Sequence, residues 1–208
     1  MRANEKLKAP DEHEIALFPC EVMYLTPARD PAEHDVLSLD FLPRNIRGQV
    51  ITAMPCYAPF SGKIVYTGND HNCILESNDE VYFADGSLGI MRILVAHSFD
   101  APTLGATYNQ GDLFYRTGNY GQSFGEHLHI EIAKVNRGDP YWNSGGIGIR
   151  GAIHMWNGFY INDTLILRDG GFDWKTYGGP TPTFGRKKKK FPWVLYSNKL
   201  RNKLLTKL

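Results

Sequence analysis

Residues 127–132 carry the clearest alternation of polar and apolar positions in the chain, and they follow a glycine-rich stretch at 118–125. An alternation of two is the period of a half-buried β-strand, because successive side chains leave a strand on opposite faces. The pattern therefore predicts that His127, His129 and Glu131 share one face, with the two histidines about 7 Å apart along the strand. It predicts that the intervening Leu128, Ile130 and Ile132 point into a core.

Other short apolar runs, separated by turn residues, predict further strands near 15–25, 36–41, 63–68, 73–77, 80–84, 89–97 and 112–116. In the run at 36–41, Ser38 and Asp40 share one face. The Asn157-Gly158 pair between β-rich runs predicts a hairpin over 152–162. No segment before residue 190 has a helical period. We therefore predict an all-β fold, mainly antiparallel, built as a sheet or sandwich.

We expect four regions along the 208 residues. Residues 1–14 are polar and predicted to be a flexible segment, 15–135 form the β domain, and 136–185 form an extension with a Gly-rich loop and the hairpin. Residues 186–208 form a basic tail that ends in a short helix with Leu200, Leu204, Leu205 and Leu208 on one face. The first residues lack the apolar core of a signal peptide, and no run approaches the ~20 apolar residues of a membrane span.

Charge is unevenly distributed along the chain. The tail from residue 186 has nine Lys and Arg and no acid, which leaves 14 basic and 22 acidic residues in the rest. Such asymmetry indicates a partner for the tail. The run at 186–190 would also suit nucleic acid, but a lone basic run meets any polyanion, so we consider nucleic acid an unlikely partner. Cys20, Cys56 and Cys73 are odd in number and widely spaced, which favours free thiols or small core residues, and their spacing does not call for a disulfide.

Catalytic zinc in proteins usually has three ligands from His, Asp and Glu, and leaves one position open. The chain offers His34 and Asp40 upstream and His129 downstream. Five stretches then occur in the order found in lysostaphin/LytM-type zinc endopeptidases, and the resemblance spans about residues 30–135: Asp40-Phe41, 58–65, 95–97, 111–114 and 118–131. The chain resembles this family most specifically in the last stretch, where a glycine-rich loop, H-x-H and apolar alternation coincide.

The resemblance implies zinc held by His34, Asp40 and His129, with His97 and His127 as the catalytic pair. It implies hydrolysis of peptide cross-links in bacterial peptidoglycan, on a small antiparallel β scaffold, and leaves the cleaved bond open. One departure is the spacing: five residues separate His34 from Asp40, whereas the commonest family pattern has three, and that spacing would place the histidine at Val36. Longer spacings occur in family members that include phage-tail enzymes. With the missing signal peptide and the tail, this favours a virion or tail-associated lysin, or an enzyme acting outside the cell at the wall.

The main alternative is a degenerate homologue without zinc that binds cell walls or activates an enzyme, and Val36 is the residue that supports it. Glu131 either orients one of the histidines or is a solvated strand residue. His13, His71 and His154 lie outside any motif and are expected to be surface or structural residues.

Overall fold

The computed structural model describes residues 1–25, 37–45, 47–123, 125–144, 148–161 and 164, together with the backbone of 165–168 and 185–186. The strands are β1 (Val22–Leu25), β2 (Ser38–Leu42), β3 (Pro55–Tyr57), β4 (Gly62–Thr67), β5 (Cys73–Ser77), β6 (Val81–Tyr82), β7 (Leu88–Ala96), β8 (Thr107–Tyr108), β9 (Leu113–Arg116), β10 (Leu128–Val135), β11 (Ala152–Ile153), β12 (Leu165–Arg168) and β13 (Gly185–Arg186). A helix of one turn, α1, spans Met155–Gly158.

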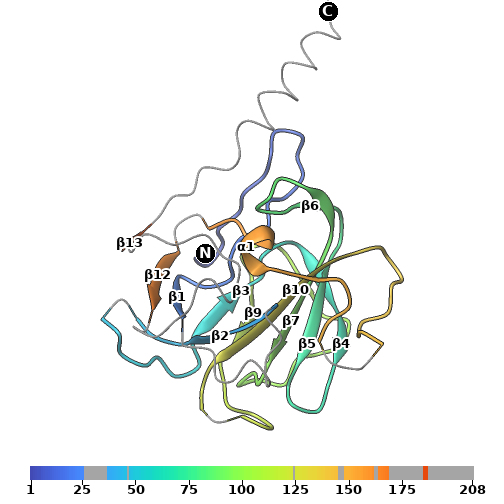
Figure 1. The fold of residues 1–208 in the computed structure, drawn as a ribbon. Helices are drawn as coiled ribbons and strands as arrows, with labels where there is room; N and C mark the ends of the chain where they lie inside the picture. The colour runs from blue at the N-terminus through green and yellow to red at the C-terminus, as the bar shows by residue number, and fades with distance from the viewer. Residues whose placement is uncertain are drawn as a thin grey trace, which may run out of the picture.

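One large sheet organises the molecule (Figure 1), with the strand order β13-β12-β1-β2-β10-β7-β5-β4-β8. β11 adds to β10 and β6 adds to β7, while β3 and β9 form a separate two-stranded sheet. Among the described strand pairs, only β1 and β12 are parallel. The prediction of an all-β, mainly antiparallel fold is confirmed.

The large sheet buries side chains on both faces. One face packs against the β3–β9 sheet, and its cluster includes Ile93 and Val95 of β7, Leu128, Ile130 and Ile132 of β10, and Cys56, Phe114 and Tyr115 from the small sheet. The opposite face carries a smaller cluster around Ile74, Leu94, Ala133 and Ile149, partly covered by Tyr141 and Trp142. Because the side chains of β10 alternate, His129 and Glu131 lie on the face of the sheet that carries this smaller cluster.

The structure differs from the expectation for residues 1–14. This segment lies against the β domain, since Met1 is buried and Asn4 N–H donates to Gly111 O. The backbones of Lys8 and Glu14 form an isolated antiparallel β-bridge. Met1, Ala9, Ile15 and Leu17 form a cluster with Tyr82 and Tyr160. A few apolar residues in a polar segment are enough to fix it when the domain offers a matching surface.

The hairpin predicted over 152–162 is not formed in the described residues of that range, 152–161. Ala152 and Ile153 pair with β10, and the chain then makes the helical turn α1 where the Asn-Gly pair had predicted a hairpin turn. Met155, Trp156 and Phe159 are buried in the main core, so packing against the sheet overrides the local turn preference. Gly158 lies so close to Ile132 that a Cβ there would overlap its side chain.

Several predictions concern residues outside the described part of the chain. His34 is one of them, as are the basic tail beyond Arg186 and its leucine-bearing helix. Within the part of the chain that is described, no helix has the length and apolar character needed to cross a bilayer.

Candidate metal and catalytic centre

The site forms where β10 lies between β2 and β7. His129 on β10 pairs in register with Asp40 on β2, and on the other side with Ala96 at the end of β7. Residues directly opposite each other on neighbouring strands have Cβ atoms about 4.5–5.5 Å apart and point to the same face. Strand register therefore brings a carboxylate and an imidazole together, and places His97, the residue after β7, beside them.

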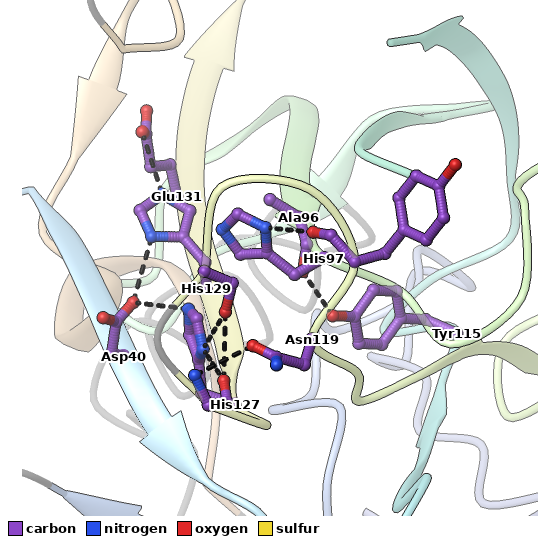
Figure 2. A network of polar contacts seen from close by, with 11 residues as sticks. Asp40, Ala96, His97, Tyr115, Asn119, His127, His129 and Glu131 are labelled. Atoms are coloured by element: carbon purple, nitrogen blue, oxygen red, sulfur yellow. Dashed lines mark hydrogen bonds and ion pairs between the residues drawn. The ribbon is translucent and has the colours of Figure 1, made fainter. Parts of the chain in front are cut away.

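His129 lies between two carboxylates (Figure 2). Its Nδ1 is 3.0 Å from Asp40 Oδ1, and its Nε2 is 3.4 Å from Glu131 Oε1. The side chain of Glu131 is 10% exposed, and its Oε2 accepts a 2.7 Å hydrogen bond from Ile149 N–H. Burial alone would lower the pKa of His129, but the hydrogen bonds to Asp40 and Glu131 outweigh it and raise the pKa to about 9.

His127 is oriented by backbone carbonyls of the glycine-rich loop. Its backbone N–H donates to Gly118 O at 3.1 Å, and its Nδ1 lies 2.7 Å from Gly125 O. A carbonyl only accepts hydrogen bonds, so Nδ1 carries the proton and Nε2 has the lone pair. Nε2 lies 3.8 Å from Asp40 Oδ1, so this imidazole faces the carboxylate shared with His129.

His97 is also oriented by a backbone carbonyl, which comes from a different segment. Its Nδ1 lies 2.8 Å from Tyr120 O and therefore donates, which again leaves Nε2 as the basic nitrogen. Burial lowers the pKa of His97, although the hydrogen bond to Tyr120 opposes this. The backbone of His97 is left-handed, with φ +68°, a conformation rare for residues other than glycine. Its ring centroid lies 4.9 Å from that of His127 and 6.4 Å from that of His129.

The left-handed turn at His97 is fixed by contacts that the sequence did not suggest. His97 N–H donates to Asp70 O and Tyr120 N–H donates to His97 O. The ring of His71 stacks on that of Tyr120 at 3.5 Å, and its Nδ1 donates to Ser98 O. His71, which we expected to be a surface or structural histidine, thus supports the segment that positions His97.

Asp40 and His129 have the donor types and spacing expected for zinc. Tetrahedral ligands about 2.0–2.1 Å from the ion lie about 3.3 Å from each other, close to the observed 3.0 Å between Oδ1 and Nδ1. The second nitrogen of His129 meets a carboxylate, which is the usual arrangement behind a metal-binding histidine. Within the described residues, no group of three His, Cys, Asp or Glu is arranged to hold a metal. The predicted third ligand, His34, lies outside them.

Sequence reasoning left the role of Glu131 open and missed the carbonyls of Gly125 and Tyr120. A weak signal existed for Glu131, since it shares the histidine face. The carbonyl contacts had none, because every residue carries a carbonyl and only the loop geometry selects these two.

The chain is similar, at low identity, to several known proteins. No family model matches the chain. Morphogenesis protein 1 of Bacillus phage B103 is 24% identical over 168 residues, which cover 78% of this chain and 44% of the relative. The chain therefore spans less than half of that relative's length.

Similar solved structures include the catalytic domain of the antimicrobial peptidase lysostaphin from Staphylococcus simulans, with 20% identity, 55% of this chain and 78% of that chain covered, and a TM-score of 0.37. A zinc-containing peptidase from Vibrio cholerae has 15% identity, with 61% of this chain and 42% of that chain covered, and a TM-score of 0.36. The catalytic domain of the prophage-encoded M23 protein EnpA from Enterococcus faecalis has 14% identity, with 64% and 86% covered, and a TM-score of 0.39. These values are too low to transfer a function, which must rest on the site itself.

Proposed function

We propose that the chain is a zinc-dependent endopeptidase that hydrolyses peptide cross-links of bacterial peptidoglycan. The observation that carries this proposal is the register of β2 and β10, which places Asp40 Oδ1 3.0 Å from His129 Nδ1 beside two further imidazoles. The ordered motifs that resemble lysostaphin/LytM-type enzymes support the same reaction.

Asp40 and His129 would hold the ion, with His34 as the third ligand. Zinc, when bound, supplies a Lewis acid that polarises a carbonyl and makes a coordinated water acidic near neutral pH. With the ion bound, Glu131 would hold the remaining ring proton of His129 on Nε2, so that Nδ1 would offer its lone pair to the ion beside Asp40.

His97 and His127 would move the protons. Both donate through Nδ1 to a backbone carbonyl, so both offer an unprotonated Nε2. One can take the proton of the attacking water, and the other, once protonated, can stabilise the developing oxyanion or protonate the leaving amine. Their ring centroids are 4.9 Å apart, close enough for both to serve one scissile bond.

Two measurements on the same protein preparations test the proposal. They are the zinc content of the protein and its hydrolysis of purified peptidoglycan. Wild type should carry about one zinc per chain and release new amino groups from the wall. His129→Ala should lose both. His97→Ala and His127→Ala should keep the zinc and lose ~10²–10⁴-fold in turnover. His154→Ala changes a histidine outside the site and serves as the matched control.

Zinc that persists in His129→Ala at wild-type stoichiometry would refute the ligand set. Retention of zinc by His34→Ala would refute that ligand alone. A wild-type protein that holds no zinc and cleaves nothing, but sediments with cell walls, would instead establish the degenerate binding module.

The relative from Bacillus phage B103 is named a morphogenesis protein, which supports a role for this chain in a phage particle. We propose that the basic tail, with nine Lys and Arg from residue 186 onward, docks on the wall or on another virion subunit. Truncation after Gly185 should then leave cleavage of a small soluble peptide nearly intact, while salt-sensitive sedimentation with walls or virions falls. Loss of soluble-peptide cleavage at unchanged zinc content would show that the tail belongs to the active domain.

A further inference from the structure

Residues 17–20, which precede β1, run beside residues 56–59, which begin in β3, and both segments are buried in the main core or against it. Leu17 N–H donates to Pro59 O at 3.1 Å, and Tyr57 N–H donates to Pro19 O at 2.8 Å. Two residues forward on one segment correspond to two residues back on the other, so the segments are antiparallel. Between these bonds, Phe18 N–H turns outward to Tyr160 O, and Ala58 N–H turns outward to Asp112 O.

The same register, carried one residue further, places Cys20 opposite Cys56. This is a non-hydrogen-bonded position, where the Cα atoms of an antiparallel pair lie about 4.5 Å apart and the side chains approach most closely. That separation falls within the ~4.4–6.8 Å range of disulfide-linked residues. The two Sγ atoms are 2.9 Å apart, and both residues are fully buried. Non-bonded heavy atoms prefer about 3.5–4.0 Å, so the sulfurs are already closer than ordinary packing brings them.

We propose that Cys20 and Cys56 are a disulfide-forming pair, which cross-links the segment before β1 to β3 when the chain meets an oxidising environment. The bond would close a loop that contains β1, β2 and Asp40, and so tie the metal-binding carboxylate to the core. If the proposed function holds, the chain works outside the host membrane, where disulfides persist.

Cys73 is the internal comparison. It is also buried, but it lies in the middle of the large sheet on β5, where its register partners are Val95 of β7 and Thr67 of β4. The described residues therefore give Cys73 no cysteine opposite it, and the proposal assigns the bond to one of three conceivable pairs.

The reaction is thiol–disulfide exchange with a low-molecular-weight disulfide such as oxidised glutathione. The thiolate of Cys20 attacks one glutathione sulfur and releases the other glutathione as a thiolate, which takes up the proton of Cys20. The thiolate of Cys56 then attacks the Cys20 sulfur, forms the Cys20–Cys56 bond and releases the second glutathione, which takes the second proton. Two electrons pass from the protein to glutathione. Burial raises the pKa of Cys56, so exchange should occur before the core has closed.

The experiment refolds the full-length chain from urea in mixed reduced and oxidised glutathione, blocks the remaining thiols, and maps linked peptides by mass spectrometry. We expect one linked pair, Cys20 with Cys56, and one free thiol, Cys73, in wild type. Cys73→Ser should form the same bond, while Cys20→Ala and Cys56→Ala should form none. The thermal midpoint should rise on oxidation by on the order of 10 °C in wild type and Cys73→Ser only.

Disulfide mapping after expression in the oxidising bacterial periplasm is a second test that needs no refolding step. We expect the same Cys20–Cys56 bond there. Three free thiols in folded, oxidised wild type would overturn the proposal. So would a bond that involves Cys73, or a midpoint that falls when the Cys20–Cys56 bond forms. Zinc content and hydrolysis do not enter these outcomes, so the disulfide stands or falls independently of the proposed function.

Discussion

Replacing Glu131 by Gln tests whether this buried carboxylate controls the nitrogen of His129 that we propose as a zinc ligand. Glu131 Oε2 accepts from Ile149 N–H at 2.7 Å, and Oε1 faces His129 Nε2 at 3.4 Å. In Glu131→Gln the amide oxygen can keep the bond from Ile149, which turns the amide NH₂ toward Nε2. Two donors cannot face each other, so a singly protonated His129 would carry its proton on Nδ1 and lose the lone pair that zinc binding requires there.

Loss of such a partner behind a metal-binding histidine typically weakens metal binding about 10–100-fold, or about 1.4–2.8 kcal/mol. We expect a zinc dissociation constant raised by this factor in Glu131→Gln, measured by competition with a chromophoric chelator. Glu131→Ala should in addition lose about 1–3 kcal/mol of unfolding free energy, because the buried Ile149 N–H loses its acceptor.

Glu80→Gln is the matched control, since it removes the same charge at an exposed position. Nitrogen chemical shifts of the His129 ring would report the tautomer directly. If Glu131→Gln binds zinc as tightly as wild type while His129 keeps its proton on Nε2, the carboxylate does not set the tautomer and the reasoning is refuted.

Three further predictions follow from the packing. Burial raises the pKa of Cys73 to about 12, so an alkylating reagent at pH 8 should modify Cys73 only after unfolding, as read by mass spectrometry; rapid modification of the folded chain would contradict its burial. Glu76→Gln should cost about 3 kcal/mol in urea unfolding, because it removes the charge 2.7 Å from the buried guanidinium of Arg92; a loss below 1 kcal/mol would mean that the other contacts of Arg92 suffice. Gly118→Ala should lower both stability and hydrolysis, because its Cβ would lie 2.4 Å from the carbonyl oxygen of His97, and wild-type values for both would show that this turn can relax.

The strands that the sequence predicted well are those whose pattern is local. β5 coincides with the predicted 73–77, and β7 and β10 lie within a few residues of their predicted positions. In β10 the predicted division of faces is confirmed, since Leu128, Ile130 and Ile132 are in the main core. A strand with one buried face records its orientation in its own residues, so no knowledge of its neighbours is needed.

Features that depend on distant partners were not predictable in the same way. The Asn157-Gly158 pair is a sound local hairpin signal, but the burial of Met155 and Trp156 against the sheet decides the backbone there. The left-handed backbone of His97 has no sequence signature, because it is imposed by bonds to Asp70 and Tyr120. The pairing of Cys20 with Cys56 depends on the register of two segments 36 residues apart in sequence.

The candidate centre itself combines both kinds of information. The sequence placed His127 and His129 on one face of a strand, but only the order β2-β10-β7 makes them neighbours of Asp40 and His97. His129 is opposite Asp40 on one side and Ala96 on the other, so the position of every described site residue is set by the register of these three strands. A slip of β2 by one residue would replace Asp40 with an apolar neighbour on that face. The buried alternation of Leu39 and Phe41 in the main core opposes that slip, and so the hydrophobic pattern of β2 is what holds the carboxylate at the proposed metal position.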